Sequence, residues 1–520
     1  MRLLWPAKTQ APNRQKALKL VIPEIHETPV PLADFGRTHF IAIGGAGMNV
    51  IARLLAAQGV EVQGSDVADS ANLAQLREHG IQTWVGHDAE HVTGAPSPVE
   101  TVVVSSAVRE ENPELAAARA GGLRVLHRSD ALASLMAGQR AVAVAGAHGK
   151  TTTSAMVATV LRELGLDPSF AIGGTVVVAN SDDAAMGDAG TTKDAASGQE
   201  STHIPGGHHG QSDILVAEAD ESDGSFLNYT PYLAIVTNVE PDHLDHYGSQ
   251  EAFDAAFDAF AKRIRPGGYL IACADDKGSA QMAANYKAQG GQVITYGTAP
   301  ESDVKITDVQ TPSEGANAQI SGNLIGNQPV NIKLQVPGLH NIRNATAAII
   351  AAMLLDTEVT AAKAARAAHV FMGTGRRFEH RGTVNDIRLF DDYAHHPTEI
   401  EALLAGARPV AGEGRILVLF QPHLYSRTKA FADRFATALS NADLAIITGV
   451  YKAREDVDPK VGAHTIIGAA PVGTANLLAV EDKHLAAQLL ASSANPGDVL
   501  LLVGAGDVTE LADVVLANLA

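Results

Sequence analysis

The clearest chemical signal in the sequence is a glycine-rich turn that ends in a lysine and three threonines. Gly146–Thr153 lies between an apolar run at 141–145 and a segment with helical spacing. A strand that feeds a glycine turn and a helix N-terminus presents backbone N–H groups and a helix dipole to phosphate oxygens. In such a turn, Lys150 would neutralise the β- and γ-phosphates and the Thr151 hydroxyl would hold Mg²⁺.

This turn departs from the common G-x-x-x-x-G-K-[ST] pattern at one position. Val144 stands where the first glycine of that pattern would be, so the turn is a shorter variant. The alternative interpretation is a structural glycine turn followed by a surface lysine. The strand–turn–helix context favours phosphate binding. We therefore predict a nucleoside triphosphate site here.

Two acidic clusters follow the next apolar runs along the chain. They cover residues 218–223 and 240–245. Carboxylate oxygens suit Mg²⁺, and a phosphoryl group in transfer needs cationic charge around it. Each of these acids, taken singly, is equally compatible with a solvated loop or a helix cap. The clusters thus predict one or two metal ligands without choosing among their members.

A second glycine turn, Gly44–Gly47, follows an apolar run near the start of the chain. It lacks the third glycine of the G-x-G-x-x-G pattern, because Asn49 occupies that place. Asp66 ends the next predicted strand, where an acid contacts a ribose in dinucleotide-binding folds. The sequence leaves two interpretations open, a nucleotide-binding turn and plain helix–strand packing.

Two basic and aromatic stretches lie in the last third of the chain. Arg376 and Arg377 stand beside a glycine, and guanidinium groups bind phosphoryl or carboxylate groups through paired hydrogen bonds. For Arg376, a salt bridge at a domain linker is an equal alternative.

The histidines of this region form the second stretch. His395 and His396 are compatible with a metal pair, a base or a hydrogen-bonding scaffold. Further along, His423 and Arg427 suit a substrate that carries a carboxylate.

Parallel sheets with helices on their faces must position these groups, because apolar runs alternate with segments of helical spacing. We expect an α/β protein with three domains: a Rossmann-like N-terminal sheet, a P-loop-type central ATPase domain and a Rossmann-like C-terminal domain. The expected boundaries are an N-terminal extension over 1–36 and domains over 37–138, 139–370 and 371–520.

One stretch of the central domain has a different composition. Residues 180–212 contain no Leu, Val, Phe, Trp or Tyr, which predicts a flexible insertion. Its histidines, His203, His208 and His209, suit solvated loop positions better than a metal site.

Composition excludes several classes of function. The 520 residues carry a net charge of −19, which argues against nucleic-acid or anionic-membrane partners. A single cysteine excludes an internal disulfide framework and a multi-cysteine zinc site. No apolar run reaches the roughly 18 residues of a membrane helix, and the basic N-terminus lacks the apolar core of a secretory signal. We expect a cytoplasmic protein.

Taken together, the motifs resemble those of the Mur ligases of peptidoglycan synthesis, and they are most similar to the branch that adds L-alanine. The resemblance covers residues 38 to about 510 in the family's order. It is carried by the segments 44–48, 146–153, 218–226, 237–245, 337–345, 375–379, 391–399 and 421–428.

The resemblance implies an activity and its partners. The three domains would bind a UDP-sugar, ATP and an amino acid in that order. The implied reaction joins L-alanine to the lactyl carboxylate of UDP-N-acetylmuramate through an acyl phosphate, in cell wall precursor synthesis. ATP and two Mg²⁺ ions are the implied cofactors, and we expect a monomer or a weak homodimer.

The resemblance also implies residue roles. The catalytic residues would be Lys150, Glu218, His243 and Arg377, and the metal ligands Thr151, Glu218 and His243. ATP would be bound by Gly146, Ala147, His148, Gly149, Lys150, Thr151, Thr152, Asn341, Asn344, Arg377 and Asp392. The UDP-sugar would be bound by Gly45, Ala46, Gly47, Asp66, His87, Ser106 and Arg128. The amino acid would be bound by Tyr393, His395, His423 and Arg427.

One position departs from the family pattern, and three other functions compete. Leu424 stands where some members carry arginine, which bears on the amino-acid contacts. A relative that adds a preformed murein tripeptide to the same UDP-sugar is the nearest alternative. A dinucleotide-dependent oxidoreductase rests on the first glycine turn alone, and a non-catalytic paralogue would have no use for two metal positions.

Overall fold

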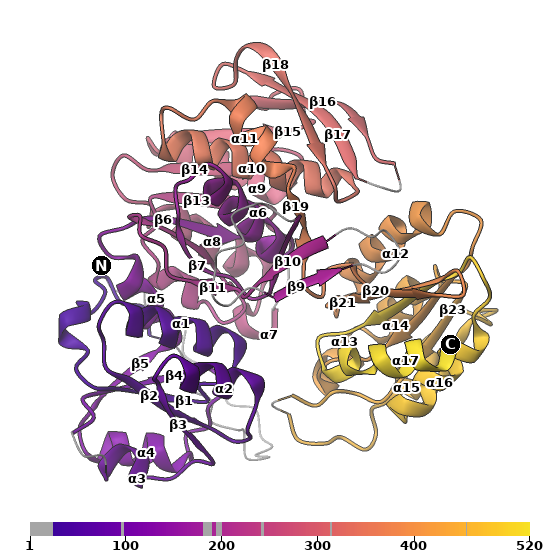
Figure 1. Ribbon diagram of the computed structural model, residues 1–520, viewed down its shortest axis with the longest axis horizontal. Helices are drawn as coiled ribbons and strands as arrows, with labels where there is room; N and C mark the ends of the chain where they lie inside the picture. The colour runs from indigo at the N-terminus through magenta and orange to yellow at the C-terminus, as the bar shows by residue number, and fades with distance from the viewer. Residues whose placement is uncertain are drawn as a thin grey trace.

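The chain is divided by its sheets into three α/β domains. The computed structural model describes residues 24–94, 98–179, 190–193, 200–240, 244–312, 315–453 and 455–520. Figure 1 shows the N-terminal domain at the lower left, the central domain above it and the C-terminal domain at the right. The predicted fold class is confirmed.

The N-terminal domain is a five-stranded parallel sheet in the order β3-β2-β1-β4-β5. Its central strands β1 and β4 are buried at every residue, as expected of a parallel sheet covered on both faces. Its strands are β1 (Thr38–Ile41), β2 (Val62–Asp66), β3 (Gln82–Val85), β4 (Thr101–Val104) and β5 (Arg124–His127). Its helices are α1 (Ala46–Ala57), α2 (Ala71–Glu78), α3 (Glu90–Thr93), α4 (Pro113–Ala120) and α5 (Arg128–Met136).

The central domain has a ten-stranded sheet in the order β11-β7-β12-β6-β13-β14-β15-β16-β17-β18. Its middle strands run parallel and β16–β18 form an antiparallel extension. The strands are β6 (Arg140–Ala145), β7 (Ser169–Ala171), β11 (Gly207–His208), β12 (Ile214–Glu218), β13 (Leu233–Val236), β14 (Tyr269–Cys273), β15 (Val293–Gly297), β16 (Val304–Gln310), β17 (Ala316–Gly322) and β18 (Gly326–Leu334).

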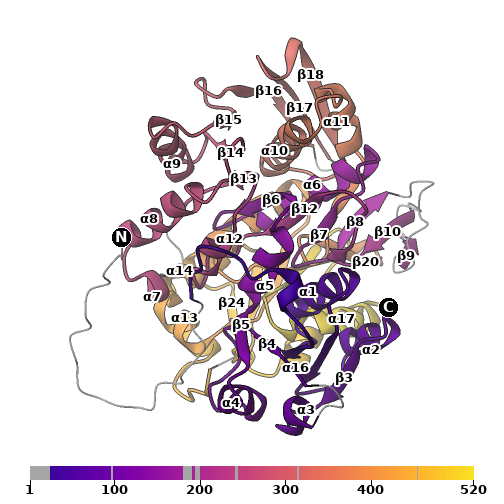
Figure 2. The same ribbon diagram turned by 90° about the vertical axis from the view of Figure 1, so that its left-hand side faces the viewer.

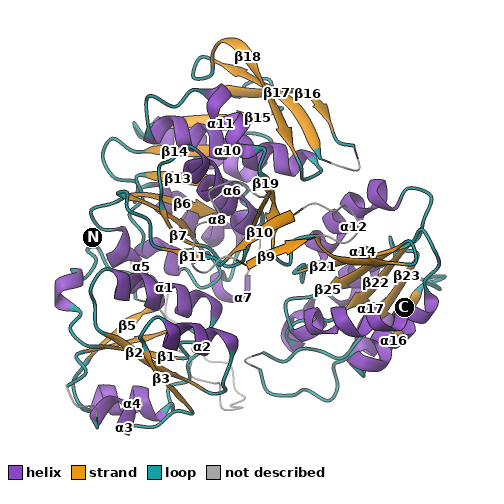
Figure 3. Ribbon diagram, viewed as in Figure 1, coloured by secondary structure: helices purple, strands orange, loops and turns teal. Residues whose placement is uncertain are grey.

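The helices of the central domain cover this sheet, as Figure 3 shows. The long apolar helix α10 packs beside α6. Every residue from Ala345 to Ala352 is buried in this packing. The helices are α6 (Lys150–Glu163), α7 (Leu244–Tyr247), α8 (Gln250–Ala261), α9 (Lys277–Ala288), α10 (Leu339–Leu355) and α11 (Ala361–Ala368).

Two expectations about the central domain need correction. A second sheet has the order β19-β8-β10-β9 and contains β8 (Val176–Ala179), β9 (Gly190–Lys193), β10 (Glu200–Ile204) and β19 (Phe371–Thr374). The described part of the predicted insertion therefore forms strands, since β10 pairs with β8 and its Ile204 is buried. β19, which we expected to open the third domain, instead pairs with β8. The insertion has few apolar side chains to stabilise a strand, and backbone pairing of β10 with the apolar strand β8 stabilises it instead.

The C-terminal domain is a six-stranded sheet in the order β20-β21-β25-β22-β23-β24. All its neighbours are parallel except the β20–β21 hairpin. Its strands are β20 (Glu379–Val384), β21 (Ile387–Asp392), β22 (Ile416–Phe420), β23 (Leu444–Ile447), β24 (Leu477–Ala479) and β25 (Val499–Val503). Its helices are α12 (Pro397–Ala411), α13 (Tyr425–Ala430), α14 (Ala432–Leu439), α15 (Ala463–Gly468), α16 (Lys483–Ser493) and α17 (Ala512–Leu519).

The described end of the predicted extension packs on the first two domains. Phe35 is fully buried, and the backbone N–H of His26 donates to Oδ1 of Asn228 at 2.8 Å. Figure 2 shows α1 and α5 of the N-terminal domain side by side, below β6 and β12 of the central sheet. Across the described residues, no helix is both long and apolar enough to cross a membrane.

Candidate active site

The glycine turn predicted to bind phosphate connects β6 to α6. Gly146 lies at φ 137° and Gly149 at φ 82°, which glycine adopts without strain. A side chain at position 146 would also place Cβ 2.2 Å from Oγ1 of Thr237. The turn therefore requires glycine at this point. The first N–H groups of α6 have no intrahelical acceptor and are available to an anion.

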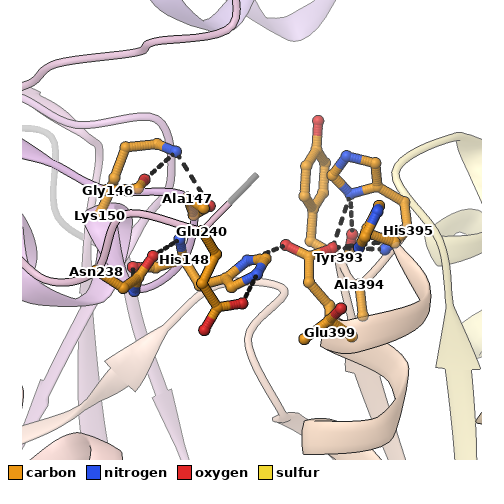
Figure 4. Close-up of polar contacts among 12 residues, drawn as sticks. Gly146, Ala147, His148, Lys150, Asn238, Glu240, Tyr393, Ala394, His395 and Glu399 are labelled. Atoms are coloured by element: carbon orange, nitrogen blue, oxygen red, sulfur yellow. Dashed lines mark hydrogen bonds and ion pairs between the residues drawn. The ribbon is translucent and has the colours of Figure 1, made fainter. Parts of the chain in front are cut away.

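The ammonium group of Lys150 lies over this turn (Figure 4). It donates to the carbonyl oxygen of Gly146 at 2.7 Å and to Oε1 of Glu221 at 3.0 Å. Burial lowers the pKa of Lys150, but the carboxylates of Glu221 and Asp220 outweigh burial and hold that pKa above its ordinary value. Lys150 is therefore a cation at neutral pH, beside the helix N-terminus where a phosphate would bind.

Two residues that follow β13 hold the turn in place. The backbone N–H of His148 donates to Oδ1 of Asn238 at 3.0 Å, and Nδ2 of Asn238 donates back to the carbonyl oxygen of His148 at 2.9 Å. The hydroxyl of Thr237 donates to the same carbonyl oxygen at 2.6 Å. Thr237 and Asn238 directly follow β13, the strand beside β6, so the sheet itself holds the turn in position without a ligand.

The two asparagines predicted to bind ATP lie on α10, and of the two only Asn344 reaches the turn. A Cβ atom at Gly149 would lie 3.6 Å from Oδ1 of Asn344. The amide of Asn341 instead donates to the carbonyl oxygen of Pro337 at 2.7 Å, where it ties down the start of its own helix. Both side chains are largely buried.

Glu218 is the acid that fits a metal ligand beside the turn. It ends β12 in register with Val144 of β6, and its Oε1 accepts the backbone N–H of Gly173 at 3.0 Å. Burial raises the pKa of Glu218, while Lys150 and the Thr151 hydroxyl lower it. A desolvated carboxylate next to a threonine hydroxyl supplies the hard oxygen donors that Mg²⁺ prefers.

These donors fit Mg²⁺ by type, although they form only part of a ligand set. The described residues contain no group of three or more His, Cys, Asp or Glu side chains arranged to hold a metal ion. The predicted second ligand, His243, lies outside the described residues.

Two other acids of the first cluster, Asp220 and Asp223, bind the N-terminal domain instead. A guanidinium nitrogen of Arg128 donates to Asp220 at 2.8 Å, and the hydroxyl of Ser106 donates to Asp223 at 2.6 Å. Arg128 and Ser106 were both predicted to contact a UDP-sugar. The structure therefore places them where the first domain meets the central domain.

The remaining residues predicted to contact the UDP-sugar lie at the carboxyl end of the first sheet. Gly45 caps α1, and Ala46 and Gly47 form its first turn. Asp66 accepts the backbone N–H of Gly44 at 2.8 Å. His87 lies 3.0 Å from Glu114, whose hydrogen bond raises the pKa of His87 above its ordinary value.

In the third domain, Asp392 is a buried carboxylate that organises a loop. It accepts the backbone N–H of Phe378 at 2.7 Å and that of Ala394 at 2.8 Å. Burial raises the pKa of Asp392 to about 6, against the opposing charge of Arg377. Asp392 and Arg377 are therefore close enough to interact. That both bind ATP, as the resemblance to the Mur ligases implied, stays a prediction.

The raised pKa of Asp392 predicts a pH dependence. Because this pKa lies above its ordinary value of 3.8, stability contributed by the protonated form is lost as the pH rises from about 4 to about 6. Activity should show the opposite trend, since the ionised form accepts two N–H groups and faces Arg377. We expect kcat/KM to fall below pH 6.

The variant Asp392→Asn should lack this acidic limb and remain at a low, level activity from pH 5 to 7. A pH series of phosphate release measures both proteins. A wild-type profile that is level through pH 6, or an asparagine variant that keeps the limb, would contradict the assignment.

Four aromatic rings converge beside Asp392. Tyr393 lies under the guanidinium groups of Arg376 and Arg377, 5.0 and 5.3 Å from its ring centroid. The ring of His395 forms edge-to-face contacts with the rings of Tyr393 and His423. The ring centroids are 5.3 and 5.7 Å apart, respectively.

The fourth ring, Tyr451, stacks on His423 at 5.8 Å. Arg427 lies close enough to lower the pKa of His395. All four residues predicted to bind the amino acid are therefore together, and Tyr451 is a neighbour that the sequence did not predict.

Backbone contacts fix the position of Tyr451. Its N–H donates to the carbonyl oxygen of Pro422 at 2.8 Å, and its carbonyl oxygen accepts the N–H of Leu424 at 3.0 Å. Leu424 is buried at φ 69°, an uncommon conformation for leucine. Arg376 donates to the carbonyl oxygens of Gly504 and Gly506 at 2.6 and 3.2 Å, and its Nε lies 3.5 Å from Oδ2 of Asp391. All three partners belong to the C-terminal domain, so these contacts do not link two domains.

Gly506 offers a direct test of the Tyr451 position. A Cβ atom there would lie 2.6 Å from Cγ of Tyr451 and 2.3 Å from Oε1 of Gln421. Gly506→Ala should displace the ring and raise KM for the amino acid roughly tenfold, because small displacements in a site are costly. KM for ATP should stay within about twofold. The matched control is Gly468→Ala, where a Cβ meets nothing within 4 Å. Equal changes in both KM values would contradict a role confined to the amino-acid site.

Glu399 joins the central and third domains, as Figure 4 shows. Its Oε1 lies 3.6 Å from Nδ1 of His148 in the glycine turn and 4.0 Å from Arg377. Its Oε2 accepts the backbone N–H groups of His395 and His396 at 2.9 and 3.1 Å. Burial raises the pKa of Glu399, but His395 and His148 outweigh burial and hold it well below its ordinary value.

Several residues of this site were not singled out by the sequence. Glu221, Asn238 and Glu399 all lie inside the motifs that carry the family resemblance, and Glu399 had a local signal as the third residue of a helix that Pro397 opens. Tyr451 had no signal, because an aromatic residue after a strand is ordinary.

The comparisons with known proteins agree with this arrangement. Residues 37–140 match the model of the Mur ligase family catalytic domain, 144–352 that of the Mur ligase middle domain, and 376–506 that of the Mur ligase glutamate ligase domain. The chain belongs to the Mur ligase family.

Individual relatives narrow the comparison further. A UDP-N-acetylmuramate–L-alanine ligase of Kineococcus radiotolerans is 50% identical over 94% of this chain and 97% of its own. One of Renibacterium salmoninarum is 49% identical over 94% and 97%. Among solved structures, the UDP-N-acetylmuramate-alanine ligase of Thermotoga maritima has a TM-score of 0.70 and 28% identity, covering 92% of this chain and 98% of its own. A murein peptide ligase of Psychrobacter arcticus has a TM-score of 0.68 and 25% identity, covering 93% and 98%.

Proposed function

We propose that this chain joins L-alanine to the lactyl carboxylate of UDP-N-acetylmuramate at the expense of ATP. The observation that carries the proposal is the convergence of a Gly-Lys-Thr turn and a cluster of four aromatic rings on Glu399, in a chain about 50% identical to relatives named for this activity. A carboxylate is a poor electrophile, so activation by phosphoryl transfer must precede amide formation.

The residues divide between two steps. In the first, a carboxylate oxygen of the sugar attacks the γ-phosphorus and ADP leaves, while Lys150 and Arg377 offset the charge that spreads over the phosphoryl oxygens. In the second, the amine attacks the acyl carbon and phosphate leaves. Thr151 and Glu218 would hold Mg²⁺, which supplies further positive charge at the phosphates. Positioning and charge neutralisation do most of this work.

The sugar and amino-acid sites would lie on either side of this centre. Arg128 and Ser106 would contact the UDP-sugar from the first domain, and Tyr393, His395, His423 and Arg427 would receive L-alanine. The murein tripeptide ligase is the second candidate, because a murein peptide ligase shares the fold at a similar TM-score. The relatives near 50% identity favour the alanine-adding activity. Family membership removes the oxidoreductase alternative.

Phosphate release tests the proposal. The purified chain, ATP and Mg²⁺ are combined with UDP-N-acetylmuramate and L-alanine, glycine, L-serine or the tripeptide. We expect release that needs both the sugar and L-alanine, with an amide product by mass. Release that needs the tripeptide would transfer the chain to the recycling activity. No release with any acceptor would contradict the proposal. A cytoplasmic location and a monomeric or weakly dimeric state stay predictions from the sequence.

A further inference from the structure

Two oxygen acceptors hold the imidazole ring of His395 in one tautomer. Its Nδ1 lies 3.0 Å from the carbonyl oxygen of Tyr393 and 3.3 Å from Oε2 of Glu399. A carbonyl oxygen and an ionised carboxylate only accept hydrogen bonds. The Nδ1 atom must therefore carry a hydrogen, and in the neutral ring Nε2 carries the lone pair.

The surroundings of His395 keep this ring neutral. Burial lowers its pKa, Arg427 and Arg377 lower it further, and Glu399 and the carbonyl group of Tyr393 only partly oppose them. Within the described residues, Nε2 takes no hydrogen bond from the chain. The ring is about one fifth exposed, among residues predicted to receive the amino acid. A neutral imidazole with an open Nε2 is a proton acceptor.

Glu399 occupies a position that serves this purpose. Its Oε2 is fixed by two backbone N–H groups at the start of α12, and its Oε1 faces His148 and Arg377. The carboxylate is therefore held from two sides and does not rotate freely away from His395.

We propose that His395 accepts a proton from the incoming ammonium group through Nε2, and that Glu399 is the positioning residue that fixes the required tautomer. This inference rests on the proposed function, because it concerns its second step. One ammonium proton passes to Nε2, and the freed nitrogen lone pair forms the C–N bond to the acyl carbon. The bond from that carbon to the phosphate oxygen breaks. The second proton, lost as the amide forms, leaves with phosphate, and His395 returns its proton to solvent.

Hydroxylamine separates this role from a structural one. It is already a neutral amine at neutral pH, so it traps the acyl phosphate as a hydroxamate without a base. Each variant's rate with L-alanine is divided by its own rate of hydroxamate formation, which cancels any loss in the first step. We expect this ratio to fall by about tenfold or more in Glu399→Ala and by about a hundredfold in His395→Ala. Glu399→Gln, which keeps a neutral acceptor, should restore part of the L-alanine rate. Glu401→Gln, an exposed change on the same helix, is the matched control.

The outcomes distinguish the inference from the proposed function. Equal losses with L-alanine and hydroxylamine would show that Glu399 is structural, and no loss would show that it positions nothing; either result overturns the inference. If the wild type uses another amine, the function is wrong and that amine replaces L-alanine here.

A readout that needs no activity completes the test. Nitrogen-15 spectra of the histidine rings, assigned with His395→Ala, should show the Nδ1–H tautomer in the wild type and a mixture in Glu399→Ala. The Nε2–H tautomer in the wild type would overturn the inference.

Discussion

Replacing Lys150 by alanine should lower kcat for phosphate release by about a thousandfold, because Lys150 is the cation over the turn where phosphate would bind. The same change should also destabilise the protein. Glu221, whose side chain is fully buried, would lose its lysine partner at 2.9 Å. Breaking a buried ion pair from one side costs roughly 3–5 kcal/mol. We therefore expect a Tm several degrees below that of the wild type, measured by calorimetry beside the kinetic assay.

A double variant separates these two effects. Lys150→Ala with Glu221→Gln removes both charges, so we expect it to recover much of the lost Tm and none of the activity. Lys363→Ala, an exposed lysine in the first turn of α11, is the matched control and should leave both quantities unchanged. Normal phosphate release by Lys150→Ala would contradict the phosphate-site assignment. Recovery of activity in the double variant would show that the single variant failed only by misfolding.

The second large effect is expected at Glu218. Glu218→Gln keeps the size of the side chain and an acceptor for the N–H of Gly173, and it removes only the charge. If Glu218 holds Mg²⁺, kcat should fall by about a hundredfold or more, and the Mg²⁺ concentration for half-maximal activity should rise. Because burial raises the pKa of Glu218, the neutral variant should be at least as stable as the wild type.

A titration of activity against Mg²⁺ at saturating ATP measures this prediction. Removing Mg²⁺ with a chelator should abolish phosphate release by the wild type. Glu358→Gln, an exposed residue between two helices of the central domain, is the control. An unchanged Mg²⁺ dependence in Glu218→Gln would exclude Glu218 as a ligand, whatever happens to kcat.

Part of this site could be predicted because its signals are local. A strand, a glycine turn and a helix that begins at Lys150 occupy one short stretch, and the backbone geometry of the turn follows from its glycines. The same holds for the polar cluster after β12 in the central sheet and for those after β21 and β22 in the C-terminal sheet, since the carboxyl ends of parallel strands are where α/β sheets bind ligands.

Composition misled the prediction at the insertion. Residues 200–204 hold few apolar side chains, yet they form β10 between β8 and β9. Backbone hydrogen bonds to an apolar neighbour stabilise a strand whose own residues give no sign of it. The assignment of β19 failed for the same reason, because pairing partners far along the chain leave no local trace.

The sequence by itself determined the three α/β units, the glycine turn between a strand and a helix, and the residue types available for charge neutralisation. Only the tertiary structure decided which basic partner each acidic side chain contacts. It pairs Lys150 with Glu221, turns Asp220 toward Arg128, and sets Glu399 between His148 and His395. Hydrophobic patterning fixes where strands and helices form, but their relative placement depends on packing between distant segments. The contacts that set protonation states in this site cross those segments, so they exist only once the domains are assembled.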